Sequence, residues 1–173
     1  MSKQKLFGGI VKAFDVGMAT GDRFGQTKNI KLPEIKWKTE GAQGGGMLMP
    51  VEIRMGMEAM KIEFSTFGWD ADCYRQCKEH AISGQPLHIT AALEDETTGE
   101  MHSLAITANG RVGQISTDEF EQNKLSMTKM VINLTTYKVV LDGEVLTDID
   151  SINGIFKMGG VDYGAKIAKA LGR

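Results

Sequence analysis

Residues 124–149 read KLSMTKMVINLTTYKVVLDGEVLTDI, and this stretch decides the fold. Through residues 124–141 it is rich in strand-forming residues, and apolar side chains alternate with polar ones. The alternation changes parity between Leu134 and Tyr137, which predicts either a β-bulge or a strand buried on different faces at its two ends. Asp142-Gly143 then supplies the positive φ angles of a type I′ turn, so the residues that follow return as a second strand. The stretch predicts a tight antiparallel hairpin.

Shorter runs of the same alternation fill much of the remaining chain. They cover residues 28–38 with a break at Pro33, and residues 51–55, 60–65, 87–93 and 104–106. The runs on either side of Gly56 predict two strands joined by a bend, of which the second is half-buried. The acidic segment 94–100 predicts the turn of another hairpin. The chain has 21 glycines and 3 prolines, and the glycines fall between these runs, as in a domain that is mainly β.

Two segments show helical spacing instead. Within Asp70–His80, the residues Ala71, Tyr74 and Cys77 recur every three positions, which predicts a short helix that covers a sheet. Residues Tyr163–Leu171 predict a helix near the end of the chain.

Length and composition indicate an ordinary globular protein. The 173 residues suffice for one domain, 1–173, whose core needs neither a disulfide nor a structural metal. Hydrophobic residues make up 42% and charged residues 24%, which argues against a disordered chain and excludes a fibrous one.

The formal net charge of −2 gives no global basic field that would hold nucleic acid. The charge is uneven, however. Residues 1–40 contain 8 basic and 4 acidic residues, which leaves 12 basic and 18 acidic residues for positions 41–173. This asymmetry indicates either a solvated face or complementary charge between identical subunits.

The sequence shows no sign of export or of a membrane span. Residues 1–9 carry lysines but lack the apolar core of a secretory signal. The longest apolar stretches, such as residues 130–132, fall far short of the ~20 residues that cross a bilayer. We therefore expect a protein made and used in the cytoplasm, at least initially, where Cys73 and Cys77 would be reduced thiols.

The segment from Gly41 to Pro50 has an unusual composition. Three consecutive glycines, Gly44-Gly45-Gly46, lead directly into three adjacent apolar residues, Met47-Leu48-Met49. Adjacent side chains cannot all face one core, and full burial of each is worth about 1.5–3 kcal/mol. Two interpretations remain open: the loop folds back over its own domain, or it is an arm that is buried against another subunit.

The candidate metal ligands form a weak pattern. Cys73, Cys77 and His80 could project from one side of a helix as a C-x3-C-x2-H set. Structural zinc requires four ligands, however, and neither His88 nor His102 stands at a paired spacing. Thiols packed in the core are the favoured interpretation, and we expect no metal and no cofactor.

The sequence also lacks a catalytic motif. Residues 41–46 are glycine-rich but have no Lys-Ser/Thr pair that would reach phosphates and Mg²⁺. The carboxylates Asp142, Asp148 and Asp150 lie near the predicted hairpin without a nucleophile or a metal-binding motif beside them. We expect them to serve turns and sheet edges, and we expect the protein not to be an enzyme.

A succession of short motifs resembles the major tail tube proteins of contractile-tailed bacteriophages, an FII-like family, and the tubes of R-type phage-tail-like bacteriocins. The motifs are Leu32-Pro33, Lys38-Thr39-Glu40, Gly44-Gly45-Gly46-Met47, Pro50-Val51, Met55-Gly56-Met57-Glu58-Ala59-Met60, Tyr137-Lys138-Val139-Val140-Leu141-Asp142-Gly143, Ile149-Asp150, Asn153-Gly154 and Gly160-Val161-Asp162. Their order and spacing match over essentially the whole chain. Departures lie between residues 70 and 122: Asn109 stands before Gly110 where the family often has Arg, and Asp118-Glu119-Phe120 replaces a loop with more glycine.

The resemblance implies an antiparallel β-sandwich or barrel-like domain with one flanking α-helix. It implies hexameric rings that stack into a hollow inner tube, with strands of neighbouring subunits completing one continuous barrel. It also implies that the loop at about 40–50 is an assembly arm at the subunit or ring interface. The arm residues are Glu40, Gly44, Gly45, Gly46, Met47, Leu48, Met49 and Pro50.

The implied partners are other copies of the chain, the tail sheath protein, the tape-measure protein and baseplate or initiator proteins. DNA would pass through the lumen without specific binding, and a lining with net negative charge suits that role. The implied location is the virion tail, assembled in the host cytoplasm. Alternatives are the tube of a DNA-free bacteriocin or of a type VI secretion system, and, more distantly, a monomeric β-barrel binding module.

Overall fold

A computed structural model of the chain describes residues 9–19, 21–23 and 25–172. The expectation that residues 1–9 form no secretory signal therefore lies almost wholly outside the described residues. In the described part, ten strands form one antiparallel sheet in which β12, β11, β10, β9, β8, β7, β1 and β2 follow one another and β6 pairs with both β9 and β3. The strands are β1 (Ile10–Met18), β2 (Gly21–Asp22), β3 (Thr27–Lys31), β6 (Lys61–Phe67), β7 (Gln85–Asp95), β8 (Glu100–Thr117), β9 (Met127–Leu141), β10 (Glu144–Asp150), β11 (Ile155–Met158) and β12 (Val161–Asp162).

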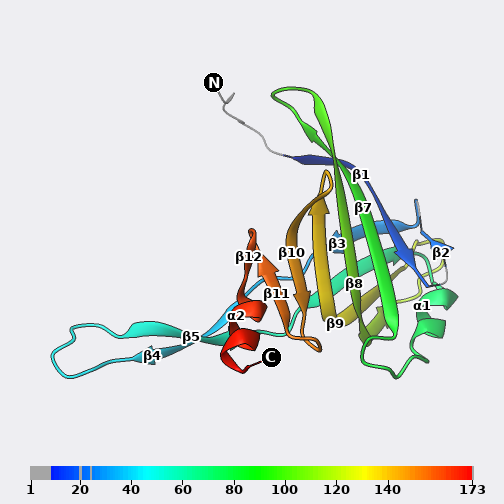
Figure 1. Ribbon diagram of the computed structural model, residues 1–173. Helices are drawn as coiled ribbons and strands as arrows, with labels where there is room; N and C mark the ends of the chain where they lie inside the picture. The colour runs from blue at the N-terminus through cyan, green and yellow to red at the C-terminus, as the bar shows by residue number, and fades with distance from the viewer. Residues whose placement is uncertain (1–8, 20, 24, 173) are drawn as a thin grey trace.

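Strand β9 organises the sheet because its two halves pair with different neighbours. Its first half, from Met127 to Asn133, pairs with β6, whereas the half from Thr136 onward pairs with β10. Along β8 the register slips between these halves, since Asn109 faces Thr136 but Gly110 faces Leu134. The predicted parity change is therefore a β-bulge. As a result the sheet folds back on itself, and β3 and β6 cross behind the long strands (Figure 1).

The predicted hairpins are confirmed. Strands β9 and β10 are joined at Asp142 and Gly143, whose φ angles of +48° and +86° are those of a type I′ turn. Strand β7 pairs along its whole length with the first part of β8, from Gln85–Gly110 to Asp95–Glu100.

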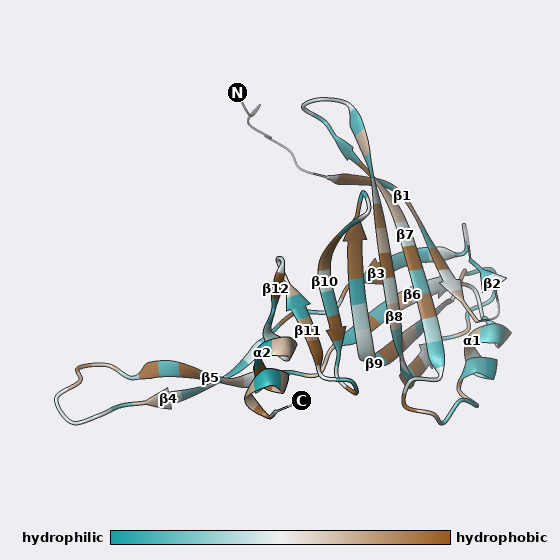
Figure 2. Cartoon of the chain, viewed as in Figure 1, coloured by the Kyte–Doolittle hydropathy of each residue, from teal (hydrophilic) through white to brown (hydrophobic). Residues whose placement is uncertain are grey.

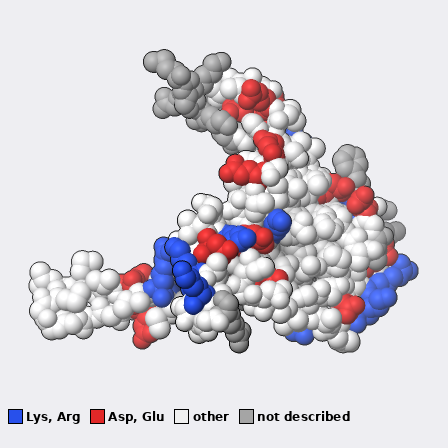
Figure 3. Space-filling model, in the orientation of Figure 1, with Lys and Arg blue, Asp and Glu red and all other residues white. Residues whose placement is uncertain are grey.

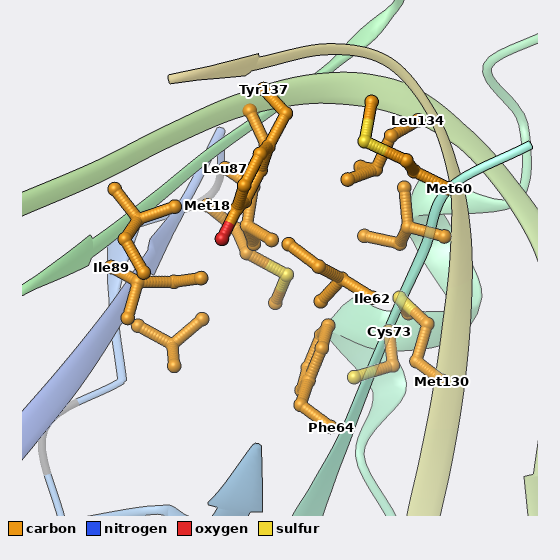
Figure 4. Packing of buried hydrophobic residues seen from close by; sticks show 14 of the residues in the cluster. Met18, Met60, Ile62, Phe64, Cys73, Leu87, Ile89, Met130, Leu134 and Tyr137 are labelled. Carbon is orange, nitrogen blue, oxygen red and sulfur yellow. The ribbon is translucent and has the colours of Figure 1, made fainter. Parts of the chain in front are cut away.

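The core lies between the long strands and the layer formed by β6 (Figure 4). Ile62 and Phe64 of β6 are buried, which confirms the predicted half-buried strand. They pack with Leu87, Ile106, Met130 and other apolar residues of the neighbouring strands. Tyr137 is also buried here, and desolvation raises the pKa of its phenol to about 12.

Two helices, α1 (Ala71–Gln76) and α2 (Tyr163–Ala170), flank the sheet in the described part of the chain. Helix α1 is shorter than the predicted segment 70–80. Asp70 caps it by accepting a hydrogen bond from the Asp72 N–H at 2.9 Å. After Gln76 the backbone N–H groups bond three residues back, so Lys78 donates to the Arg75 carbonyl in a tighter turn. No helix among the described residues has the length and apolarity to cross a membrane.

The pair β4 (Trp37–Ala42) and β5 (Val51–Met57) leaves the main sheet. These strands pair with each other, from Trp37–Met57 at the base to Ala42–Val51 at the far end, and form a sheet of their own. The resulting β4–β5 hairpin projects far from the body of the subunit (Figure 1). The bend expected at Gly56 falls after Met57, because the pairing with β4 keeps Gly56 inside β5.

Candidate assembly surfaces

The tip of the β4–β5 hairpin is a turn closed by its own backbone. The Met47 N–H donates to the Gly44 carbonyl at 3.2 Å, and the side-chain Nε2 of Gln43 adds a bond to the Met47 carbonyl at 3.0 Å. Gly46 has a φ of +86°, which favours glycine at this position. Of the residues predicted as an assembly arm, Glu40 lies inside β4, and Gly44 to Pro50 form the tip.

The hairpin exposes several large apolar side chains. Leu48 is fully exposed, with a relative accessibility of 103%, and Met49 follows at 70%. Val51, Ile53 and Met55 of β5 are each at least half exposed. The tip is also free of charged side chains on the face shown in Figure 3, and Figure 2 shows hydrophobic residues along β5. In the single chain this loop does not fold back over its own domain.

A second apolar surface lies at the base of the hairpin. A cavity of about 360 Å³ opens between β4, β5, β10, β11 and α2. Its aromatic wall is formed by Trp37, Phe156 and Tyr163, whose rings follow one another at centroid distances of 5.4 and 5.7 Å. The rest of the lining consists of Met57, Ile149, Ser151, Ile155 and Ile167. Ile155 and Ile167 are exposed. We call this site the basal cavity.

Two cations flank the basal cavity. The guanidinium carbon of Arg54 lies 4.9 Å from the centre of the Trp37 ring, and the Lys166 ammonium lies 5.3 Å from that of Tyr163. No ion pair joins either cation to a described carboxylate. The sequence did not predict this site, because its residues come from strands and a helix that are far apart in the chain. Its signals were separate ones: Trp37 is an apolar position of the alternating run 28–38, and Tyr163 begins the predicted helix 163–171.

The candidate metal ligands do not converge. Cys73 is buried in the core, where desolvation raises the pKa of its thiol. Cys77, in contrast, caps the end of α1 and is exposed, so the expectation of two core thiols is wrong for Cys77. The early end of α1 explains the difference. Among the described residues no three His, Cys, Asp or Glu side chains come close enough to hold a metal ion.

Two of the three carboxylates near the hairpin, Asp142 and Asp150, serve turns, as predicted. Asp142 accepts a hydrogen bond from the Ser103 N–H at 2.8 Å, and its other oxygen lies 2.6 Å from Nδ1 of His102. Asp150 accepts from the N–H groups of Asn153 and Ile152 at 3.0 and 2.9 Å; the Asn153 bond is the main reason why the pKa of Asp150 is lowered.

The expectation of a turn or a sheet edge is wrong for Asp148, because β10 has a strand neighbour on each side and Asp148 lies in the middle of the sheet. It faces Lys138 on one neighbouring strand and Lys157 on the other. This row of alternating charge continues from Lys157 to Asp162. The outward face of the sheet at this level therefore carries balanced charge.

Curated relatives come from two phages. The tail tube protein of Escherichia phage P2 is 28% identical over 80% of this chain and 82% of its own length. The major tail tube protein of Serratia phage KSP20 is 26% identical over 87% of this chain and 88% of its own.

Solved structures with the same fold include components of contractile injection systems. A chain of the sheath–tube complex of an extracellular contractile injection system, PVC, aligns with a TM-score of 0.54 at 10% identity, over 75% of this chain and 87% of that one. A chain of the cap of the anti-feeding prophage aligns with a TM-score of 0.54 at 12% identity, over 73% and 87%. The model of the family described as phage tail tube protein FII matches residues 10–172, and the chain therefore belongs to the phage tail tube protein FII family.

Proposed function

We propose that this tail tube protein polymerises as stacked hexameric rings into the inner tube of a contractile phage tail and that the tube conducts DNA during ejection. The single observation that carries the proposal is the β4–β5 hairpin, whose apolar tip is exposed in the isolated subunit. A soluble subunit gains from burying such a tip only in an assembly. The role is structural, and no catalytic step is required.

The arm of this assembly is formed by Glu40 and by residues 44–50. Burial of Met47, Leu48 and Met49 against another subunit would contribute about 1.5–3 kcal/mol for each side chain that becomes fully buried. The internally bonded turn at the tip limits the conformational entropy that is lost when the arm docks.

Strand β1 provides a second feature that suits a ring. Among the described residues, its segment 10–15 has a strand partner on one side, β7, and leaves the other edge free. Free edges invite pairing with another chain. A strand of the neighbouring subunit at this edge would extend the sheet toward a continuous barrel around the ring.

The outward face of the long strands suits the lining of a channel for DNA. Its central row, from His88 through Thr107 and Lys138 to Asp148 and Lys157, is polar and alternates in charge. Such a surface lacks the continuous basic strip that binds phosphate backbones, so DNA would pass without specific binding.

The proposal also assigns partners and a location. Relatives of the same fold belong to assemblies whose names include a sheath–tube complex and a baseplate. We extend those partners to this chain as a tail sheath, baseplate or initiator proteins and a tape-measure protein. The subunits would be made in the host cytoplasm and end in the virion tail.

Electron microscopy tests the proposal directly. Purified protein is examined by negative stain over a concentration series and by sedimentation in parallel. We expect rings and hollow tubes that increase with concentration. A compact monomer at every concentration, also after addition of the baseplate initiator, would overturn the proposal.

A further inference from the structure

We propose that the basal cavity receives Phe120 of a second copy of this chain and that Arg54 and Lys166 lie against the carboxylate of Glu119 beside that phenylalanine. The inference rests on the proposed function and identifies a contact between neighbouring subunits that is separate from the β4–β5 hairpin.

The cavity suits an aromatic side chain with an acidic neighbour. Its volume of about 360 Å³ exceeds the ~150 Å³ of an apolar cavity that binds benzene. Its wall offers the aromatic rings of Trp37, Phe156 and Tyr163, against which another ring can pack edge to face. Arg54 and Lys166 stand at its margin without a carboxylate partner among the described residues.

The loop between β8 and β9 supplies such a side chain. Phe120 is 75% exposed, although it lies in a segment with fixed ends, since the Asp118 N–H donates to the Met127 carbonyl at 3.0 Å. Asp118 pairs with Lys129, and Glu121 pairs with Lys124. Glu119, directly beside Phe120, has no cationic partner among the described residues. The loop thus presents an apolar ring next to an unpaired carboxylate.

The loop and the cavity lie on opposite sides of the subunit. The loop begins beside α1, where the Tyr74 hydroxyl lies 2.7 Å from that of Thr117, and it ends where Ser126 accepts from the Gly68 N–H at 2.7 Å. The cavity lies beside α2, and Figure 1 shows α1 and α2 at opposite ends of the row of strands. A contact between these two surfaces is heterologous, so it can repeat from subunit to subunit and close a ring.

Another acidic segment of the chain fits the cavity less well. The turn between β7 and β8 carries several carboxylates, but Lys12 already pairs with both Glu94 and Glu96. The turn also contains no aromatic residue between positions 94 and 100. The unpaired carboxylate and the aromatic ring therefore both favour the loop that contains Phe120.

Disulfide crosslinking tests the contact. Gln122→Cys, in the same loop as Phe120, is combined with Ser151→Cys, at the cavity lining, in a Cys77→Ser background that removes the exposed native thiol, so that Glu119 keeps its charge. After mild oxidation of the assembled protein, we expect a ladder of covalent oligomers on a non-reducing gel. The matched control combines Thr97→Cys, in the β7–β8 turn, with Ser151→Cys and should remain monomeric. A ladder from the control alone would place that turn in the cavity and overturn the inference.

Charge exchange provides a second test. Glu119→Lys and Lys166→Glu should each raise the protein concentration needed for assembly, and the double variant should return it toward that of the unmodified protein. Phe120→Ala should raise the same concentration by about tenfold or more, whereas Phe120→Leu should have a smaller effect.

The same samples separate the two proposals. Tubes that form from the crosslinking variant without any ladder, together with unchanged assembly of Phe120→Ala, would overturn the contact and leave the proposed function intact. Absence of rings and tubes from the unmodified protein, also after addition of the baseplate initiator, would overturn the proposed function, and a missing ladder under the same conditions would also overturn the contact.

Discussion

Gly110 of β8 lies directly against the backbone of Asn133 in β9. A Cβ atom at Gly110 would lie 2.2 Å from the Asn133 carbonyl oxygen, which is far inside van der Waals contact. This close approach occurs where the register of the two strands slips and Thr135 is left in the bulge. The bulge lets the two halves of β9 pair with β6 and β10, so the absence of a side chain at Gly110 is part of what shapes the sheet.

Gly110→Ala should therefore destabilise the subunit. The added methyl group meets main-chain atoms that cannot move without breaking the strand pairing, and we expect a loss of about 1–3 kcal/mol or more in the free energy of unfolding. Urea unfolding of the unassembled protein measures it. Gly45→Ala is the matched control, because a Cβ there meets nothing within 4 Å. Equal unfolding midpoints for the two variants would contradict the argument.

The elements that sequence analysis predicted correctly depend on local signals. The change of parity between Leu134 and Tyr137 and the Asp142-Gly143 pair lie within the strands and turns that they shape. The alternation of Val51, Ile53 and Met55 predicted a strand as well. It could not show that this strand would leave the main sheet, because alternation says nothing about which partner a strand takes.

The candidate surfaces were predictable only in part. The residues of the tip, Met47 to Met49, stand out because consecutive apolar side chains follow consecutive glycines. The basal cavity was hidden, since Trp37 meets Phe156 only after the sheet has formed. The exposure of Cys77 was also hidden, because it follows from the last turn of α1 rather than from helical spacing.

Asp70 gives a prediction about a buried ion pair. Arg23 pairs with Asp70, and only 4% of the Arg23 side chain is exposed. Asp70→Ala removes both this partner and the cap of α1. Asp72, at 3.9 Å from the guanidinium, is a weaker partner for Arg23. We expect a loss of about 3–5 kcal/mol in urea unfolding.

The double variant Arg23→Met with Asp70→Ala provides the control for that loss. Because it leaves no buried charge behind, it should be more stable than Asp70→Ala alone. A double variant that loses the sum of the two single effects would show that the pair is not coupled.

Tyr137 gives a prediction about alkaline pH. Its pKa in the folded protein is about 12, above the ordinary value of 10.0, so the folded state holds the phenolic proton more tightly than the unfolded chain does. The resulting stabilisation is complete below pH 10 and is lost as the pH rises toward 12, to an extent of about 2–3 kcal/mol. Tyr137→Phe should lose less stability than the unmodified protein between pH 9 and 11.5 in urea unfolding. An equal loss of stability in Tyr137→Phe and in the unmodified protein over this pH range would contradict the prediction.

Leu48→Asp tests the arm at its most exposed residue. Because Leu48 is fully exposed in the isolated subunit, we expect the variant to keep the stability of the unmodified protein and to remain soluble. In the assembly, the carboxylate would have to enter an apolar interface without a partner, which costs more than the lost apolar contact. Negative-stain microscopy and sedimentation should therefore show folded subunits that form no tubes.

The matched control for that variant is Ile82→Asp, which makes the same kind of change at an exposed apolar residue outside the β4–β5 hairpin. Leu48→Met adds a conservative change at the arm itself. We expect tubes from Leu48→Met, so that the charge rather than any change at residue 48 accounts for the defect. Normal tubes from Leu48→Asp would show that the tip is not an assembly contact, because a tip that tolerates a carboxylate is not buried against an apolar surface of another subunit. Loss of tubes from Ile82→Asp as well would mean that surface charge in general, rather than the tip, controls polymerisation.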